Sequence, residues 1–330
     1  MSIAITGGAG FLGSHVAEHL LINTNEDIYL LDKLDQANLN YKRVSRFGTF
    51  SNRIHLLTLD FTQPVSDGLV DILQDVSCIL HLGAQTHVDT SIINPMSFVQ
   101  ANVVGTCNVL ELARKLPHLQ RFFYFSTDEV FGPASRGVEY QEWARYNSTN
   151  PYAATKAGGE ELALAYSNTY GLPVTVTHCM NIFGERQHFE KFIPLCIKKI
   201  EEGDEIQVHS DVTCSTSGSR FYIHARNVAD ALFFLLMKEN LPKRDKFNIV
   251  GEKEVSNEDV VKIIGKILNK EPKYKLIDFH SSRPGHDLRY ALDGGKLKDL
   301  GWEPPKTFEE SLEKTVNWYI NNPEWLGGLR

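Results

Sequence analysis

The segment that most restricts how this chain can fold is Thr6–Gly13, TGGAGFLG, in which Gly7, Gly10 and Gly13 recur at every third position. It follows the apolar run Ser2–Thr6 and precedes Phe11–Ile22, where apolar residues recur at helical spacing. The first glycine permits a tight turn, the second lets helix N–H groups approach a pyrophosphate, and the third lets the helix pack closely on the strand. The sequence therefore predicts a strand, turn and helix that bind a dinucleotide.

Short apolar runs alternate with amphipathic stretches in the N-terminal half, which is typical of a parallel sheet between two helical layers. We expect strands at Ser2–Thr6, Asp27–Asp32, Arg53–Asp60, Ser77–Gly83, Leu119–Ser126 and Pro173–Thr177. Beyond Ile182 we expect helices at Phe189–Glu202, Arg226–Glu239, Asn257–Leu268 and Phe308–Asn321. The predicted fold is α/β, a doubly wound Rossmann-type sheet over residues 1–181 with a smaller C-terminal α/β substrate lobe over 182–330. We expect some chain crossing between the two.

Charge and apolar runs exclude several classes of protein. The net charge is −7, from 34 basic and 41 acidic residues, so no basic excess is available for nucleic acid. The longest uncharged apolar run, Ala231–Met237, is far shorter than the roughly 20 residues that span a bilayer, and Met1–Ile5 has no basic leader. The five cysteines form no C-x-x-C pair. These features indicate a cytoplasmic protein without a nucleic-acid or membrane partner.

The end of the second predicted strand indicates which dinucleotide binds. Asp32 lies 19 residues after Gly13, where a carboxylate accepts from the adenosine ribose hydroxyls and repels a 2′-phosphate. This favours NAD over NADP. Asp60 closes the third strand, where it either contacts the adenine or caps the strand end. The expected NAD contacts are Gly7, Gly10, Phe11, Leu12, Gly13, Asp32, Lys33, Asp60, Phe61, Gly83, Tyr152 and Lys156.

Tyr152 and Lys156 are four residues apart in a stretch that begins a helix after Pro151, so both lie on one helical face. An ammonium beside a phenol favours the phenolate, which predicts a Tyr152 pKa below the usual value of about 10. The lysine can also hold the nicotinamide ribose. With a dinucleotide fold upstream, this pair indicates a catalytic base and its partner.

Thr127, Asp128 and Glu129 follow the end of a predicted strand, where ligands bind in open α/β sheets. A site that both removes and donates a proton needs two acidic groups with different pKa values. Asp128 and Glu129 can supply that pair. The alternative is a loop that carries solvated acids.

Six strings together resemble the nucleotide-diphosphate-glucose 4,6-dehydratases, of the dTDP-glucose type, in the extended short-chain dehydrogenase/reductase family. The strings are TGGAGFLGSH (6–15), HLGAQTHVDTSI (81–92), STDEVFG (126–132), NPYAATKAG (150–158), SRFYIHARNVADAL (219–232) and RPGHDLRYALD (283–293). The resemblance implies a lyase that uses retained NAD to make a 4-keto-6-deoxy sugar. Tyr152 would remove the O4 proton, Thr127 would bind the O4 region, Glu129 would take the C5 proton, and Asp128 would protonate the leaving C6 hydroxyl.

The resemblance also implies a set of substrate contacts: His87, Asn181, Lys191, Arg220, Asn257, Arg283 and His286. No metal is expected, although His15, Glu18 and His19 match the H-x-x-E-H zinc pattern; they flank the polar side of the first helix and lack a third ligand. Family members usually form homodimers through a four-helix bundle, here Phe98–Arg114 and Tyr152–Tyr170 from each copy.

Departures from the family pattern concern the substrate more than the reaction. Gln85 replaces a glutamate, Glu185 and Phe189 replace prolines, and the polar loop His209–Ser219 is longer than usual. The nucleotide base therefore stays open between dTDP, UDP and another. Three other functions also stay open: a nucleotide-sugar 4-epimerase, a 5,6-dehydratase, and a catalytically silent NAD-binding scaffold.

Overall fold

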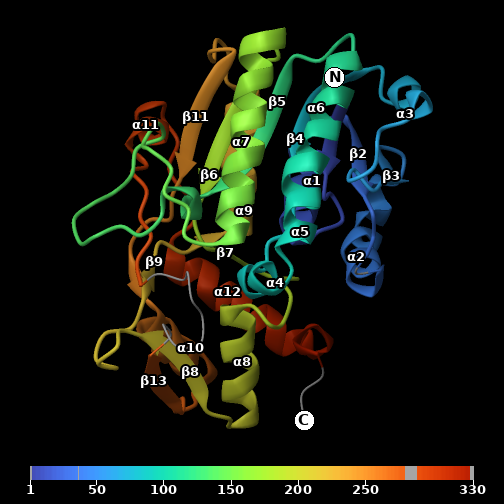
Figure 1. Ribbon diagram of the computed structural model, residues 1–330. Coiled ribbons are helices and arrows are strands. Elements are labelled where there is room, and N and C mark those ends of the chain that lie inside the picture. Colours follow the sequence, from blue (N-terminus) through green and yellow to red (C-terminus); the bar gives the residue numbers. More distant parts are fainter. Residues whose placement is uncertain (1, 36, 279–287, 328–330) are drawn as a thin grey trace.

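A seven-stranded parallel sheet forms the centre of the computed structural model, which describes residues 2–35, 37–278 and 288–327. The strands lie in the order β11-β6-β5-β4-β1-β2-β3 (Figure 1). Their bounds are β1 Ser2–Thr6, β2 Asp27–Asp32, β3 Ile54–Thr58, β4 Val76–His81, β5 Arg121–Thr127, β6 Val174–Cys179 and β11 Arg244–Ile249. The predicted doubly wound α/β class is confirmed, and no end of the six predicted strands moves by more than two residues.

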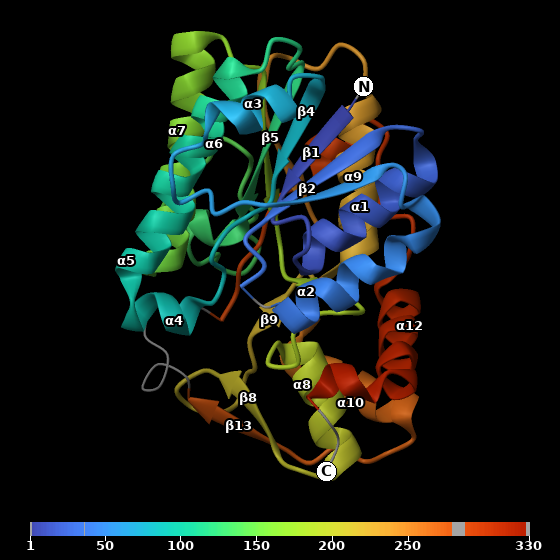
Figure 2. The same ribbon diagram turned by 90° about the vertical axis from the view of Figure 1, so that its right-hand side faces the viewer.

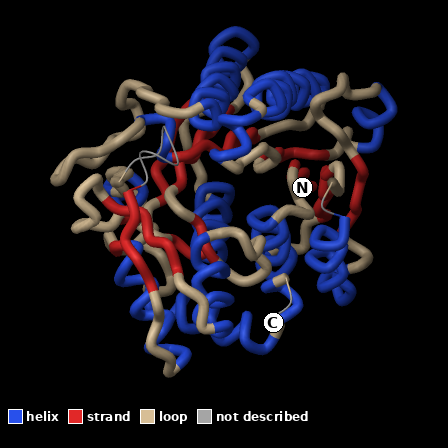
Figure 3. Tube along the Cα trace, turned by 60° about the horizontal axis from the view of Figure 1, so that its bottom comes forward, coloured by secondary structure: helices blue, strands red, loops and turns tan. Residues whose placement is uncertain are grey.

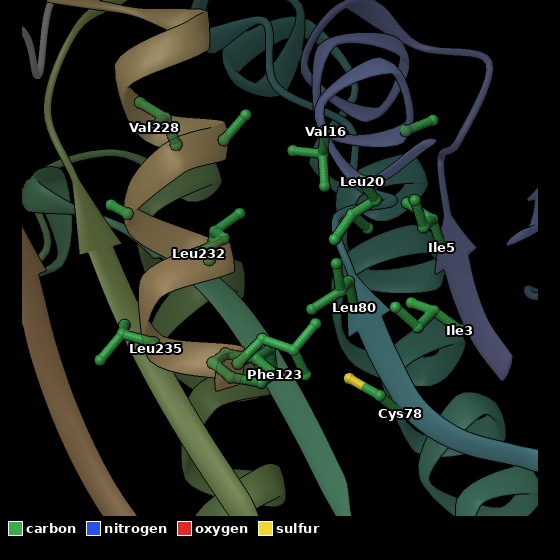
Figure 4. Packing of buried hydrophobic residues seen from close by; sticks show 14 of the residues in the cluster. Ile3, Ile5, Val16, Leu20, Cys78, Leu80, Phe123, Val228, Leu232 and Leu235 are labelled. Carbon is green, nitrogen blue, oxygen red and sulfur yellow. The ribbon is translucent and has the colours of Figure 1, made fainter. Parts of the chain in front are cut away.

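Both faces of the sheet are buried, because successive side chains of a strand point to opposite sides. Ile3 and Ile5 pack with α1 (Phe11–Asn23) and α9 (Ala225–Met237) (Figure 4). Ala4, between them, packs instead with α6 (Gly105–Lys115) and α7 (Pro151–Tyr170). Figure 2 shows these two helical layers on either side of the sheet.

The chain order reverses at β1, since β2 and β3 lie on one side of it and β4 begins the other side. Ligands bind at such a switch point, outside the carboxyl ends of the strands. Two glycines make the backbone approach possible here. Gly7 has φ +66°, and a Cβ on it would lie 2.8 Å from Gly83 Cα; a Cβ on Gly13 would lie 2.2 Å from Gly7 O.

The second lobe has its own apolar core, formed by α8 (Phe192–Glu202), α10 (Asn257–Leu268) and α12 (Phe308–Asn321). These helices pack beside the parallel pair β8 (Ile206–Ser210) and β13 (Tyr274–Asp278) (Figure 2). The α10 and α12 bounds are those predicted. Helix α8 begins three residues later than predicted, because Lys191 is its N-cap and has an extended backbone.

The chain crosses between the lobes, since α9 and β11 return to the large sheet after residue 182. The division at residues 181 and 182 stays a prediction.

Figure 3 shows the strands in red with helices in blue around them. The remaining helical elements are α2 Ala37–Val44, η1 Ser45–Phe50, α3 Asp67–Ile72, α4 Val88–Ile93, α5 Pro95–Phe98, η2 Val99–Val104, η3 Asp128–Phe131, α11 Gly295–Asp299 and η4 Pro323–Leu326. The short strands are β7 Ile182–Phe183, β9 Ser219–Arg220, β10 Ile223–His224 and β12 Val255–Ser256. Among the described helices, none is both long and apolar enough to cross a membrane.

Candidate active site

The end of β5 places Thr127, Asp128 and Glu129 in a tight turn that opens the short helix η3. The Thr127 hydroxyl caps this helix by accepting from Glu129 N at 3.4 Å, and it donates to Asp128 Oδ1 at 2.9 Å. Asp128 is buried, and its Oδ2 has no hydrogen-bond partner within the described residues. The two adjacent carboxyl groups therefore have different surroundings, and Asp128 is not a solvated loop acid.

Burial is the main cause that raises the pKa of Asp128 to about 7, and the neighbouring Glu129 raises it further. The Thr127 hydrogen bond and the positive charge of Arg220 oppose this shift. Glu129 is held from the other side, because Asn150 Nδ2 donates to its Oε2 at 2.9 Å. One carboxyl whose raised pKa favours its protonated form and one that is held by an amide are suited to opposite proton transfers.

Helix α7 carries Tyr152 and Lys156 to the same place. Asn150 is the N-cap, with Oδ1 accepting from Ala153 N at 2.8 Å, and Pro151 occupies the first turn. Tyr152 is buried beside Phe98, with ring centroids 6.4 Å apart, and its backbone N–H donates to Ser91 Oγ at 3.2 Å. The Tyr152 side chain is hydrogen-bonded to Thr127, so the structure brings Tyr152 next to the Thr127–Glu129 turn.

The expected lowering of the Tyr152 pKa by Lys156 is wrong for this arrangement. Burial raises the Tyr152 pKa, Glu129 raises it further, and a hydrogen bond with Thr127 only partly opposes them. Lys156 Nζ donates to Phe125 O at 2.6 Å. Burial lowers the pKa of Lys156 to about 7, against the attraction of Glu160.

At the switch point, Asp32 holds the glycine turn. Its Oδ2 accepts from Ala9 N at 3.1 Å and its Oδ1 from Leu34 N at 2.9 Å, while burial raises its pKa. Asp60 is exposed, and its Oδ1 accepts from Thr62 N at 3.0 Å and Thr62 Oγ1 at 2.7 Å. The ribose and adenine roles of these acids stay predictions.

The other predicted cofactor contacts lie around the same turn. Gly10 is the N-cap of α1, followed by Phe11 and Leu12, and a Cβ on Gly10 would lie 2.9 Å from Gly7 O. A Cβ on Gly83 would lie 2.6 Å from Phe61 Cε1, and Lys33 forms an ion pair with Asp35 at 3.1 Å. A Cβ on Gly7, Gly10 or Gly13 would collide with the backbone of this turn or of Gly83, so only glycine lets the turn pack this tightly at the start of α1. A tight glycine turn at a helix N-terminus fits a dinucleotide pyrophosphate.

Two of the predicted substrate residues lie together beside the catalytic turn. A Cβ on Gly218 would lie 3.4 Å from Asn257 Nδ2 and 3.6 Å from Arg220 Nη1. Arg220 Nη1 donates to Ser219 O and Leu288 O, at 2.7 and 2.6 Å, and its charge acts on Asp128. An arginine in this place can bind an anion next to the buried acid.

The remaining predicted substrate residues lie on other segments of the chain. His87 is the N-cap residue of α4, and Lys191 is the N-cap residue of α8. Burial is the main cause that lowers the pKa of His188, and the charges of Arg43, Lys191 and His87 lower it further. Asn181 is exposed, and its carbonyl accepts from Ile223 N at 3.1 Å. Arg283 and His286 lie outside the described residues.

The Glu185 departure from the family pattern has a structural partner. Its carboxylate accepts from His224 Nε2 at 3.0 Å and from Arg226 Nη1 at 2.7 Å, and its carbonyl faces His15 Nε2 at 2.9 Å. His15 is buried, so placing it on the polar side of α1 is wrong. The Arg186 guanidinium lies 2.8 Å from His15 Nδ1 and 2.7 Å from Glu18 Oε2. These side chains join α1 to the second lobe.

The sequence analysis missed several residues that hold the site. Asn102 lies in η2, a π-helix, and its Nδ2 donates to Thr155 Oγ1 at 3.0 Å and to Gln85 O at 3.1 Å. Ser91 accepts from the Tyr152 backbone and Asn150 donates to Glu129. Glu160 accepts from Ser126. Asn150 had a signal, since an asparagine before proline at a helix start predicts an N-cap. The other contacts join distant segments, which spacing does not reveal.

Comparison with known proteins places this geometry among related enzymes. A family model described as GDP-mannose 4,6 dehydratase matches residues 4–315. A dTDP-glucose 4,6-dehydratase of Escherichia coli is 36% identical, with 98% of this chain and 95% of that protein covered. A trifunctional UDP-glucose 4,6-dehydratase/3,5-epimerase/reductase of Arabidopsis thaliana is 38% identical over 99% of this chain and 48% of that longer protein. The solved dTDP-glucose 4,6-dehydratase from Streptomyces venezuelae, with NAD bound, superposes with a TM-score of 0.86, 32% identity and full coverage of both chains.

Proposed function

The chain belongs to the GDP-mannose 4,6-dehydratase family of the short-chain dehydrogenases/reductases, and from that membership we propose how its residues carry out the reaction. The protein is an NAD-dependent hydro-lyase that converts a nucleotide-diphosphate glucose, dTDP- or UDP-linked, to the 4-keto-6-deoxy sugar. The observation that carries the assignment of roles is the buried Asp128 carboxyl, whose pKa is raised to about 7 by burial, beside Glu129 and opposite Tyr152.

NAD is proposed to lie along the glycine turn and Asp32, with Lys33, Asp60, Phe61 and Gly83 at the adenosine side and Tyr152 and Lys156 at the nicotinamide side. Bound there, NAD would supply a hydride acceptor for C4 of the sugar and then a hydride donor for C6, so the reaction would have no net oxidation. The carboxylate of Asp32, already aligned by two backbone N–H groups, is placed to accept from ribose hydroxyls.

Tyr152 is proposed to take the O4 proton in the first half of the reaction. Its pKa is raised in the structure by burial and by Glu129, so its deprotonation needs nearby positive charge. Lys156, four residues along α7 and so on the same helical face, is proposed to provide it. Thr127, which hydrogen-bonds Tyr152, would bind the O4 region of the sugar.

Glu129 and Asp128 are proposed to remove water in the second half. A ketone at C4 makes the C5 proton acidic, and Glu129, oriented by Asn150, accepts it. Asp128, whose raised pKa favours the protonated carboxyl, donates its proton to the C6 hydroxyl as water leaves. The Asp128 Oδ2 atom, without a partner among the described residues, is available for this contact.

Asn181, Lys191, Arg220 and Asn257 are proposed to bind the nucleotide diphosphate, and His87 is proposed to contact the substrate. Arginine offers a planar fork to phosphate oxygens and lysine a single strong charge. Arg283 and His286 complete this proposed set.

The test is to incubate the purified protein with dTDP-glucose and with UDP-glucose in separate reactions, without added NAD, and to follow the product mass. Loss of one water molecule is expected with at least one of them, and the faster sugar identifies the base. An unchanged mass with both, also after NAD is added, contradicts the dehydratase; an inverted C4 centre without mass change supports an epimerase.

A homodimer is proposed through the four-helix bundle of the segments Phe98–Arg114 and Tyr152–Tyr170. Val104 and Tyr170 support it, since they are 37% and 50% exposed on these two segments. A single monomer mass by light scattering at micromolar concentration would refute it.

The five cysteines are all free, which supports a reducing cytoplasm as the place of action.

A further inference from the structure

A cluster of ionisable side chains is buried beneath α7, one helical turn beyond Lys156. Its centre is the carboxylate of Glu160, which is 0% exposed. Four side chains from four different segments surround it: Ser126, Tyr146, His178 and Lys246. None of these five belongs to the set of catalytic, cofactor or substrate residues described above.

Every neighbour donates to Glu160. Ser126 Oγ donates to Oε2 at 2.7 Å, His178 Nε2 lies 3.0 Å from Oε1, and Lys246 Nζ lies 2.9 Å from Oε1. The Tyr146 hydroxyl also donates to Oε1, and it accepts from Lys246 Nζ at 2.5 Å. Burial alone would raise the pKa of Glu160, but His178 and Lys246 hold it below its usual range.

The partners of His178 fix the orientation of its ring. Asn248 donates from Nδ2 to Tyr140 O at 3.0 Å and Asp293 O at 2.9 Å, which turns its Oδ1 toward His178 Nδ1 at 3.1 Å. The other ring nitrogen faces the Glu160 carboxylate. Both ring nitrogens therefore have an oxygen partner, and the ring joins Glu160 to Asn248 across the sheet.

The cluster follows one row of the sheet. Ser126, His178 and Asn248 are register partners across β5, β6 and β11. Burying such charges costs more free energy than an apolar set of similar volume, so packing alone does not account for them. Buried ionic groups of this kind can fix one arrangement of the chain where apolar groups would allow several.

The arrangement that Glu160 fixes is the position of α7 on the end of β5. Three consecutive β5 residues bind this helix: Tyr124 Oη donates to Lys156 O at 2.9 Å, Phe125 O accepts from Lys156 Nζ at 2.6 Å, and Ser126 donates to Glu160. The next residue along the strand is Thr127. A shift of about 1 Å between reacting groups can cost about a hundredfold in rate.

We propose that Glu160 is a positioning residue for the dehydration: through Ser126 it holds the Thr127–Asp128–Glu129 turn against the part of α7 that carries Tyr152. This role rests on the proposed function. Glu160 and Ser126 touch neither substrate nor cofactor in it, and they act through the three residues that follow Ser126.

The first test is Ser126→Ala, which removes one hydrogen bond and leaves Glu160 its ionic partners. The matched control is Ser77→Ala, a buried serine in β4 that donates to Ser2 O at 3.4 Å. We expect kcat to fall about tenfold in Ser126→Ala, with KM within about twofold and NADH absorbance rising during turnover, because a displaced Asp128 and Glu129 slow elimination after C4 oxidation. A wild-type kcat, or an equal loss in Ser77→Ala, refutes the role.

The second test separates positioning from stability. The triple variant Glu160→Leu, His178→Leu and Lys246→Met replaces the ions with an apolar set, which keeps such proteins folded in comparable cases. We expect it to show the kcat loss of Ser126→Ala at an unfolding temperature no lower than wild type; full activity refutes the role.

The activity of the wild type keeps failure of the role distinct from failure of the function. An inactive wild type refutes the proposed function and this role with it, whereas an active wild type with an unaffected Ser126→Ala refutes the role alone.

Discussion

The two faces of the central sheet are built differently, although both are buried. On the α1 and α9 face, the strands present Ile3, Ile5, Leu80 and Phe123 to apolar helix residues (Figure 4). On the α7 face, the carboxyl ends of β5, β6 and β11 carry an ionic cluster centred on Glu160. Apolar packing alone covers the first face. The ionic cluster on the other face therefore marks the place where the position of α7, rather than burial, is needed, and this place lies next to the catalytic turn.

The largest effect is expected from Tyr152→Phe, which removes one hydroxyl next to the catalytic turn on the polar side of the sheet. The proton-transfer role predicts that kcat falls by about a hundredfold to ten-thousandfold. No bound NADH should form when the nucleotide sugar is added, since C4 oxidation needs this base. Tyr274→Phe is the control, because this second-lobe tyrosine donates to Glu258 at 2.9 Å. Normal turnover in Tyr152→Phe would remove the tyrosine from the mechanism.

Glu129→Gln divides the polar side into its two chemical steps. The amide cannot take the C5 proton, but Tyr152 can still support C4 oxidation. We expect turnover to fall by about a hundredfold or more, while NADH absorbance builds up on the enzyme. Stopped-flow absorbance measures both. Turnover at the wild-type rate would contradict the role assigned to Glu129.

On the apolar face, Leu232→Ala should change stability and leave chemistry intact. Leu232 is 1% exposed on α9 and packs in the cluster with α1. Removing its side chain should lower the free energy of unfolding by about 3 kcal/mol, within the usual range for buried leucine truncations. Urea unfolding measures the loss, and kcat per folded molecule should stay within about twofold. A large kcat loss would mean that both faces position the site.

Much of this division could be predicted from the sequence. The glycine turn, the six strands and the Thr127–Glu129 and Tyr152–Lys156 sets are local patterns, and the structure brings the last two together. The ionic cluster could not be predicted, because Ser126, Glu160, His178 and Lys246 meet only when three strands and a helix assemble. The predicted lowering of the Tyr152 pKa is wrong for a similar reason. Burial and Glu129 raise this pKa, whereas Lys156 donates to Phe125 O.

The pH dependence of stability tests the buried acid on the polar side. Burial, and then Glu129, raises the pKa of Asp128 from 3.8 to about 7. Between these values the folded chain keeps a proton that the unfolded chain has released, so the free energy of unfolding falls as pH rises through this window. Asp128→Asn removes the titrating group, so the loss between pH 5 and pH 8 should shrink by about 2 kcal/mol. Parallel wild-type and variant curves would contradict a raised pKa.

The smallest effect is expected from Thr177→Val, which changes one polar atom on the apolar side. Thr177 lies on β6 next to His178 and so points to the other face, in register with Phe125 and Phe247. Its hydroxyl is buried and has no partner within the described residues. An unpaired buried hydroxyl is unfavourable, so the isosteric valine should raise the free energy of unfolding by about 1 kcal/mol without changing kcat. Denaturant unfolding beside a kcat measurement decides it. A loss of stability would mean that the hydroxyl is bonded and that the apolar face also depends on polar contacts. A gain in stability would mean that a buried polar atom on the apolar face can be removed with benefit. One register row away, on the other face, Ser126→Ala is expected to lower activity.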